Sequence, residues 1–397
     1  MKEKYQDLFQ PIQLPNGVTL EGRYALSSIV TNSSTSEGQV TEADIKYHER
    51  RSHSAPLQIS GAAYVEEFGQ RFEYGFSADH DDSIPGLKKL AQSMQRDGAK
   101  AVLQLVHSGR QALQAIHDFG FSYGPSAMEL NTPVPHQVLE MSPRKIRHVV
   151  TQYGDAVRRA IQAGFDGIEI TGANRYLIQA FFSVFSNKRE DEYGPQNLDN
   201  RSRFGLEVMA EVQRVIDEEA PENFILGYRI SPEESAGSLV GFTIEEMCYY
   251  IDRLLETARI DYLATAMWGD RSYNEIVRFG KHTGDLMNRV IYDHLAGRVP
   301  LMVTGGVNTA DKAAEALETT DMIAIATPLL TDPEFFLKIK ESREDEIDLT
   351  INGEESLKDL AIPQAAFKDI AYLLDAGSSL SSQTRDELRS LQYNYED

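Results

Sequence analysis

Cysteine is almost absent from this chain of 397 residues, which contains Cys248 and no other. A single thiol cannot form a disulfide within the chain, a cysteine-rich zinc site or a cysteine-ligated iron–sulfur cluster. Such sparse use of cysteine is typical of the reducing cytosol. We therefore expect a cytoplasmic protein without a bound metal.

Positive charge and long apolar segments are also scarce. The chain has 39 Lys and Arg residues against 61 Asp and Glu residues, which gives a net charge of −22. Phosphate backbones and anionic lipid surfaces would repel such a chain. No apolar run approaches the roughly 20 residues that cross a bilayer, and the polar start, MKEKYQDLFQPIQL, is unlike a signal peptide. We expect a small-molecule substrate, no nucleic acid or membrane partner, and a chain compatible with a homo-oligomer.

The sequence does contain a repeated alternation of strand and helix patterns. Strand-like apolar segments occur at residues 24–30, 57–64, 101–107, 165–171, 224–230, 261–267, 300–306 and 321–327. Helical patterns occupy 85–98, 142–164, 242–258 and 309–319. Eight strands alternating with helices predict a parallel (β/α)₈ TIM barrel. An open doubly wound sheet is the alternative, but the GxGxxG fingerprint that often marks it does not follow the first strand.

The two ends of the chain depart from this alternation. Near the start, Asn16-Gly17 stands between two short β-like runs and predicts a hairpin. Residues 341–397 read as an acidic loop followed by two helices, at about 363–375 and 383–392. We interpret residues 1–340 as the barrel and residues 341–397 as an acidic, helical extension packed on it.

Polar residues at the ends of the strands are the first candidates for function, because barrel enzymes place their chemistry there. Gln104 and Arg229 each lie between apolar neighbours within a strand, so both need buried partners. Arg229 either forms a structural salt bridge with a carboxylate or, with Gln104, faces a flat heterocycle in the barrel mouth. His107 is either a base or substrate contact, or a structural residue.

Small residues after the last two strands indicate an anion site. Gly305 and Gly306 follow the seventh strand, and Ala326 and Thr327 follow the eighth. Small side chains let backbone N–H groups approach a phosphate closely. We expect Thr327 to cap a short helix in which Pro328 is the first residue.

A long segment then resembles a known family. Residues 164–204 read GFDGIEITGANRYLIQAFFSVFSNKREDEYGPQNLDNRSRF. This pattern resembles the old yellow enzyme family of FMN-dependent ene-reductases, and supporting matches are LFQPIQLPN, LQLVHSGRQA, GYRIS, TGGV and LLTDPEFF. The resemblance covers about residues 5–340. It implies a (β/α)₈ barrel, bound FMN, and NADH or NADPH as co-substrate.

The resemblance also implies roles for individual residues. Gln104 matches the residue at the pyrimidine edge of the flavin, and Arg229 matches the arginine near flavin N1 and O2. Tyr176 matches the proton donor, and Thr171 and Asn174 occupy the places of the pair that grips the substrate's oxygen. The other implied FMN contacts are Ser28, Ile29, Val30, Gly61, Gly305, Gly306, Ala326 and Thr327.

Several positions depart from the family pattern. Thr171 replaces the usual histidine, Val30 replaces a threonine or cysteine near flavin O4, and Ala326-Thr327 replaces a Gly-Arg pair that contacts the phosphate. We therefore weigh three functions. The first is an NAD(P)H-dependent FMN oxidoreductase that reduces activated alkenes. The second is a flavin-binding barrel that has lost this activity. The third is a flavin-free lyase, which predicts a catalytic lysine or carboxylate cluster at the strand ends.

Overall fold

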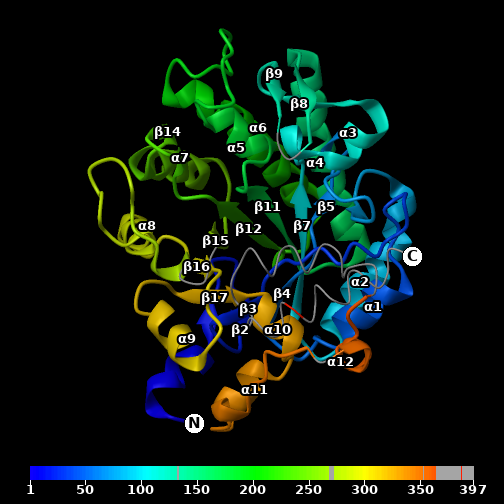
Figure 1. The fold of residues 1–397 in the computed structure, drawn as a ribbon, viewed down its shortest axis with the longest axis vertical. Coiled ribbons are helices and arrows are strands. Elements are labelled where there is room, and N and C mark those ends of the chain that lie inside the picture. Colours follow the sequence, from blue (N-terminus) through cyan, green and yellow to red (C-terminus); the bar gives the residue numbers. More distant parts are fainter. Residues whose placement is uncertain (132–133, 268–271, 352, 364–385, 387–397) are drawn as a thin grey trace.

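The computed structural model describes residues 1–131, 134–267, 272–351, 353–363 and 386, and its centre is a closed barrel of eight parallel strands (Figure 1). Each strand pairs with the next in chain order, and the last pairs with the first through Ile323 and Tyr24. The strands are β3 (Tyr24–Leu26), β4 (Leu57–Ile59), β7 (Lys100–Val106), β11 (Gly167–Gly172), β12 (Ile225–Ile230), β15 (Tyr262–Ala266), β16 (Leu301–Thr304) and β17 (Met322–Ile325). The predicted TIM barrel is confirmed.

Helices follow the strands and surround the barrel (Figure 1). They are α1 (Glu42–Glu49), α2 (Ile84–Gln95), α4 (Pro143–Ala163), α5 (Leu177–Phe182), α6 (Leu198–Glu219), α7 (Ile244–Thr257), α8 (Met287–Leu295), α9 (Ala310–Ala316), α10 (Thr327–Thr331) and α11 (Phe335–Lys340). Local sequence explains where two of them begin. Ser142 caps α4 through Lys145 N, and Thr243 and Glu246 form a capping box at α7. Each described helix is too short or too polar to span a bilayer.

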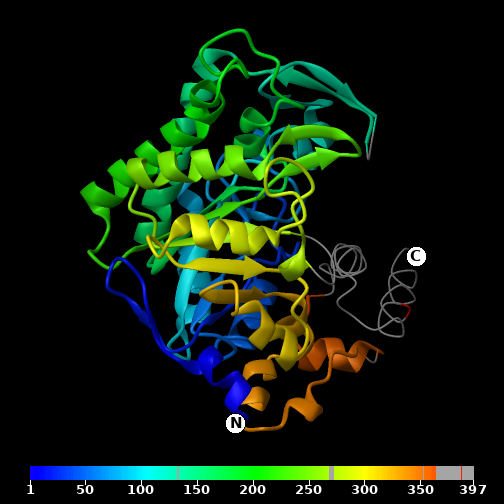
Figure 2. The ribbon, with the colours of Figure 1, turned by 90° about the vertical axis from the view of Figure 1, so that its left-hand side faces the viewer.

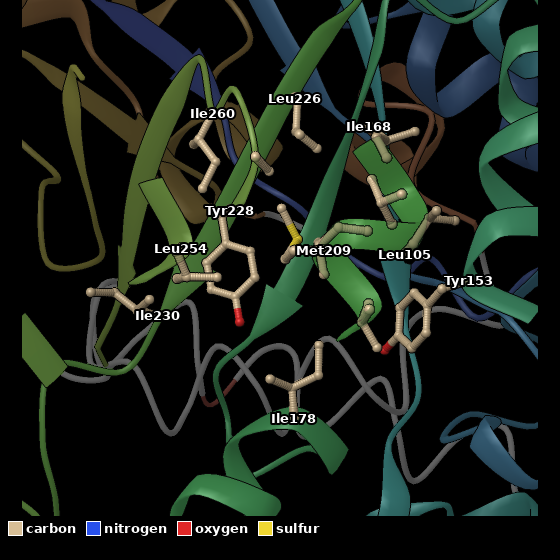
Figure 3. Close-up of a cluster of buried hydrophobic side chains, with 14 of the residues drawn as sticks. Leu105, Tyr153, Ile168, Ile178, Met209, Leu226, Tyr228, Ile230, Leu254 and Ile260 are labelled. Carbon is tan, nitrogen blue, oxygen red and sulfur yellow. The ribbon is translucent and has the colours of Figure 1, made fainter. Parts of the chain in front are cut away.

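The strands of the barrel have two faces, and the outer face forms the main core. Ile168 of β11 and Leu226 and Tyr228 of β12 point toward the helices, where they meet Met209 of α6 and Tyr153 of α4 (Figure 3). Side chains alternate along a strand, so the residues between them must face the barrel axis. Every second position of β7, β11 and β12 is therefore directed into the barrel.

The N-terminal hairpin closes one end of the barrel. Its strands, β1 (Ile12–Gln13) and β2 (Thr19–Leu20), pair antiparallel, as Asn16-Gly17 predicts. Leu14 and Leu20 pack against inward-facing residues such as Ile225. In Figure 2 this blue loop lies on the side of the barrel from which the strands start. The carboxyl ends of the strands are thus left as the open mouth.

Short elements extend the barrel at the mouth. The segment after β4 forms β5 (Ala63–Tyr64) and β6 (Phe76–Ser77), and the segment after β7 forms α3 (Leu113–Phe119), β8 (Phe121–Gly124), β9 (Met128–Leu130) and β10 (His136–Glu140). A hairpin of β13 (Glu234–Ala236) and β14 (Leu239–Phe242) follows β12. The predicted strands 24–30 and 57–64 are consequently too long, because the chain leaves the barrel after Leu26 and Ile59 to build this rim.

The end of the chain differs in detail from the prediction. A helix, α12 (Gly353–Asp359), lies inside the expected acidic loop. The described part of the extension packs Ile351, Leu357 and Ile362 against Tyr47 of α1 and Leu330 of α10. The helices predicted at about 363–375 and 383–392 lie outside the described residues, apart from positions 363 and 386.

Candidate active site

A cavity of about 620 Å³ opens at the carboxyl ends of the barrel strands. Its volume lies within the range of roughly 300–1,000 Å³ that is usual for small-molecule sites. The structure brings together most of the predicted site residues in its wall. Those that line it are Ser28, Ile29, Val30, Gln104, Asn174, Tyr176, Arg229, Gly305, Gly306, Ala326 and Thr327. Gly61 and Thr171 are absent from the lining.

A buried carboxylate organises the floor of the cavity. Glu169 of β11 is fully buried, and its Oε1 accepts hydrogen bonds from Gln104 Nε2 at 2.6 Å and from Arg229 Nε at 2.7 Å. Its Oε2 accepts a hydrogen bond from Arg229 Nη2 at 3.2 Å. A carboxylate can only accept, so the amide nitrogen of Gln104 must face Glu169. The carbonyl oxygen of Gln104 is then turned toward Ser28, whose hydroxyl lies 2.9 Å away.

The structural ion pair expected of Arg229 is confirmed, and its contact with a flat heterocycle stays a prediction. Arg229 also lines the cavity next to Gln104. Glu169 itself was not among the predicted site residues. The signal was available, since Glu169 stands between Ile168 and Ile170 in a strand and must face the barrel axis.

A strained turn positions Asn174 and Tyr176. Asn174 and Arg175 both have φ of 60°, a conformation that residues other than glycine rarely adopt. Gln111 Nε2 donates to the Asn174 carbonyl at 2.8 Å, and the Arg175 backbone N–H donates to Gln179 Oε1 at 2.8 Å. Such strain persists only where surrounding contacts enforce it, and it is common at functional sites.

Tyr176 follows this turn as a half-buried residue of the cavity wall. Burial raises the pKa of its phenol, while the nearby Arg71 guanidinium acts in the opposite direction. A phenol is protonated at neutral pH even at its ordinary pKa of about 10, and the raised pKa of Tyr176 preserves this form. This is the form that a proton donor requires.

Thr171 lies deeper than the sequence predicts. It is two residues beyond Glu169 on the same face of β11 and is 1% exposed. Among the described residues its hydroxyl has no hydrogen-bond partner. A buried hydroxyl without a partner costs free energy. Thr171 lies outside the cavity lining, so a molecule bound in the cavity would reach this group only if the residues of the wall shift.

Glycines shape the wall at the ends of β16 and β4. Gly305 and Gly306 have φ of 95° and 76°. A Cβ at Gly305 would lie 2.5 Å from Ser272 Oγ, and one at Gly61 would lie 2.6 Å from the Ile29 carbonyl oxygen. Larger residues would therefore displace the surrounding wall. Gly61 does not line the cavity itself. Its lack of a side chain leaves room for Ile29, which does line the cavity.

The start of α10 corrects one prediction. Thr327 is the first residue of this helix, and Ala326 precedes it without a side-chain cap. The expected capping by Thr327 is wrong, because the helix begins one residue earlier than Pro328 suggests. The hydroxyl of Thr327 is consequently not used as a cap, and Thr327 lines the cavity.

His107 belongs to a separate polar cluster outside the cavity lining. Its Nδ1 accepts from the Gly109 backbone N–H at 3.0 Å, so its Nε2 donates to Glu66 at 2.8 Å. Lys145 Nζ also lies 2.8 Å from Glu66. Burial alone would raise the pKa of Glu66, but His107 and Lys145 lower it to about 2. The structural interpretation of His107 is the one that its contacts support.

A second carboxylate, which the sequence did not single out, lies at the rim. Glu234 is buried and accepts a hydrogen bond from Gln179 at 3.1 Å. It also lies 3.8 Å from Arg110 and 3.6 Å from Arg175. These partners tie the turn that holds Tyr176 to β13.

Comparison with known proteins agrees with this geometry. Residues 7–346 match the model of the NADH:flavin oxidoreductase / NADH oxidase family. The chain is 52% identical to an uncharacterized oxidoreductase of Streptococcus pyogenes serotype M5 over 100% of both chains. It is 35% identical to a probable NADH-dependent flavin oxidoreductase of Bacillus subtilis, over 90% of this chain and 94% of that protein.

Two further similarities are more limited. An NADH:acrylate oxidoreductase of Vibrio harveyi is 33% identical over 97% of this chain, which spans only 38% of that protein. An old yellow enzyme homologue of Zymomonas mobilis has a similar structure, with a TM-score of 0.74 at 24% identity, over 90% of this chain and 99% of that one. This second likeness shows the fold.

Proposed function

Because the chain belongs to the NADH:flavin oxidoreductase / NADH oxidase family, we propose that it binds FMN in the barrel mouth and uses NADH or NADPH to reduce activated alkenes. Enones and nitroalkenes are examples of such substrates. One observation carries the proposal: Glu169 holds Gln104 and Arg229 at the floor of the cavity that Tyr176 borders.

The residues of the cavity fit the cofactor. Gln104 offers a carbonyl acceptor and Arg229 a cationic donor, which suit the two kinds of polar atom on a pyrimidine edge. The orphan hydroxyl of Thr171 lies in the same part of the barrel. Gly305 and Gly306 let backbone groups approach the phosphate, and the start of α10 at Thr327 lies beside them in the wall.

When bound, FMN would supply hydride chemistry, taking a hydride from the nicotinamide and passing one to the β-carbon of the alkene. The protein groups act on the substrate. Tyr176 donates its phenolic proton to the α-carbon. Asn174, with Thr171 beneath it, stabilises the negative charge that develops on the activating oxygen.

Two alternatives are less well supported. A barrel that has lost this activity would explain Thr171, Val30 and Thr327, yet it leaves the strained turn that presents Tyr176 without a purpose. A flavin-free lyase needs a lysine or a free carboxylate cluster. Among the described residues no lysine lines the cavity. Of its three glutamates, Glu234 and Glu275 have arginine partners and Glu233 accepts a hydrogen bond from the Arg278 backbone N–H.

The colour of the purified protein tests the proposed function. We expect flavin absorbance that NADH or NADPH bleaches under anaerobic conditions and that an enone restores. A protein that binds no flavin after incubation with FMN would contradict the proposal. Bleaching without reoxidation by any activated alkene would favour the second alternative.

A further inference from the structure

Arg71 differs from the other arginines of the cavity. It is half-buried, lines the cavity and lies between β5 and β6. The remaining arginines in the lining all have carboxylate neighbours: Arg229 with Glu169, Arg175 with Glu234 and Arg278 with Glu275. Within the described part of the chain, Arg71 has no such ion pair. It is therefore a cation of the wall whose charge remains available to a ligand.

The contacts of Arg71 leave one edge of its guanidinium unused. Nη1 donates to Gln111 Oε1 at 2.8 Å and to the Gln111 carbonyl oxygen at 3.3 Å. Among the described residues, Nε and Nη2 have no hydrogen-bond partner. A guanidinium edge made of Nε and one Nη binds a carboxylate through two parallel hydrogen bonds. Gln111 thus fixes Arg71 through Nη1 and leaves this edge free.

The position of Arg71 links it to the reacting part of the site. Its guanidinium carbon lies 5.7 Å from the centre of the Tyr176 ring. Gln111, which holds Arg71, also donates to the Asn174 carbonyl at 2.8 Å. Arg71, Gln111 and the turn from Asn174 to Tyr176 therefore form one hydrogen-bonded unit. An anion on Arg71 would lie within one small molecule's length of the proton donor.

We propose that Arg71 binds the carboxylate of the substrate and that the substrates are α,β-unsaturated carboxylates, an inference that rests on the proposed function. NAD(P)H supplies the hydride that is added at the β-carbon, and Tyr176 supplies the proton that is added at the α-carbon and is then reprotonated by water. The C=C bond becomes a C–C single bond in the saturated acid, and NAD(P)H becomes NAD(P)⁺. Hydride addition at the β-carbon increases the negative charge on the carboxylate. Arg71 stabilises that charge, whereas the buried Thr171 cannot carry a compensating positive charge.

With an overall charge of −22, the protein would attract an anionic substrate only through a local positive charge such as that of Arg71. Glu233, Glu234 and Glu275 also line the cavity and would repel a carboxylate. Arg110, Arg175 and Arg278 lie beside these acids. Arg71 is held by Gln111 and has no carboxylate neighbour among the described residues, so it is the arginine of the lining to which we assign the substrate carboxylate.

The test compares a carboxylate with its neutral amide. The FMN-loaded protein is assayed with acrylate and with acrylamide, as the parent and as the variants Arg71→Met, Arg71→Lys and Arg278→Met. Arg71→Met should raise KM for acrylate about ten- to a hundred-fold. KM for acrylamide and the rate of flavin reduction by NADH should change less than about twofold. Arg71→Lys should fall between the parent and Arg71→Met, and Arg278→Met should affect both substrates alike.

A binding measurement separates recognition from catalysis. Titration with propionate, which cannot be reduced, should perturb the flavin spectrum of the parent and do so about tenfold more weakly in Arg71→Met. Equal losses for acrylate and acrylamide would overturn the proposal in favour of a structural role. A raised KM for NADH with unchanged acrylate kinetics would mean that Arg71 serves the phosphates of the co-substrate instead. If the parent reduces acrylamide but neither reduces acrylate nor binds propionate, the carboxylate class is wrong while the proposed function stands.

Discussion

Glu169 and Arg229 form a buried, two-point ion pair beneath the cavity, with N···O distances of 2.7 and 3.2 Å. The same carboxylate accepts a hydrogen bond from Gln104 Nε2, with 2.6 Å between Nε2 and Glu169 Oε1. A buried carboxylate is stable only when several donors compensate it. Glu169 therefore sets the orientation of both side chains that we assign to the flavin.

Replacing either partner of this pair should be costly, because it leaves a buried charge without compensation. We expect Glu169→Gln and Arg229→Met each to lower the free energy of unfolding by about 3–5 kcal/mol in the flavin-free protein. The double variant should lose much less than the sum of the two. Urea denaturation of the four proteins measures this cycle, and simple additivity would show that the pair is not coupled.

We expect the hydroxyl of Thr171 to contribute to ligand affinity and not to the stability of the flavin-free protein. Thr171→Val keeps the shape of the side chain and removes a buried hydroxyl that has no partner among the described residues. The flavin-free variant should be as stable as the parent or slightly more stable, whereas its affinity for FMN or substrate should fall by about 1 kcal/mol. Thermal unfolding with and without FMN checks this. A loss in the flavin-free protein would indicate a structural hydrogen bond.

An arginine at Thr327 should strengthen cofactor binding. Thr327 is at the start of α10 and lines the cavity, at the place where the family pattern has an arginine. A charge-assisted hydrogen bond to the phosphate should tighten FMN binding by about one to three kcal/mol in Thr327→Arg. Quenching of flavin fluorescence on binding measures the affinity. No gain would mean that another cation of the wall already contacts the phosphate.

The sequence predicted the barrel well because its signals are local. Eight apolar runs, helix caps at Ser142 and Thr243 and the Asn16-Gly17 turn each depend on neighbouring residues. Boundaries at the mouth were harder to predict. Residues 27–30 and 60–62 look like strand, but the barrel strands end before them. Residues 27–30 and Ala62 line the cavity instead.

The site was predicted in part for a similar reason. Gln104 and Arg229 stand out as polar residues in apolar strands, and the family resemblance assigned them roles. Arg71 gave no comparable signal, because it lies in a polar segment, GQRFEYGF, and reaches the cavity only through the fold. The burial of Thr171 depends on the position of β11 within the barrel. The alternation of residues along the strand does not determine that position.

Acid should destabilise the protein through Glu66. Its pKa in the folded state is about 2, below the ordinary value of 4.5, because His107 and Lys145 stabilise the carboxylate. This stabilisation is present above pH 4.5 and is lost as the pH falls toward 2, and it amounts to roughly 3 kcal/mol. Glu66→Gln should therefore be less stable at neutral pH and should lose less stability on acidification.

Urea denaturation between about pH 7 and pH 3 gives this comparison. Burial lowers the pKa of His48 to about 3, so His48 adds acid sensitivity that both proteins share. Parallel pH profiles for Glu66→Gln and the parent would show that the Glu66 cluster contributes nothing to the acid transition.

The most direct test of the proposed function measures two rates separately in Tyr176→Phe: the reduction of the flavin by NADH and its reoxidation by an enone. In anaerobic stopped-flow experiments, NADH should bleach the flavin of the variant within about twofold of the parent rate, since this step needs no proton from Tyr176. Reoxidation by cyclohexenone should slow by about a hundredfold or more, because the variant lacks the general acid. Parent-like rates in both steps would contradict the assignment of Tyr176 and leave the turn at Asn174 and Arg175 as a purely structural feature.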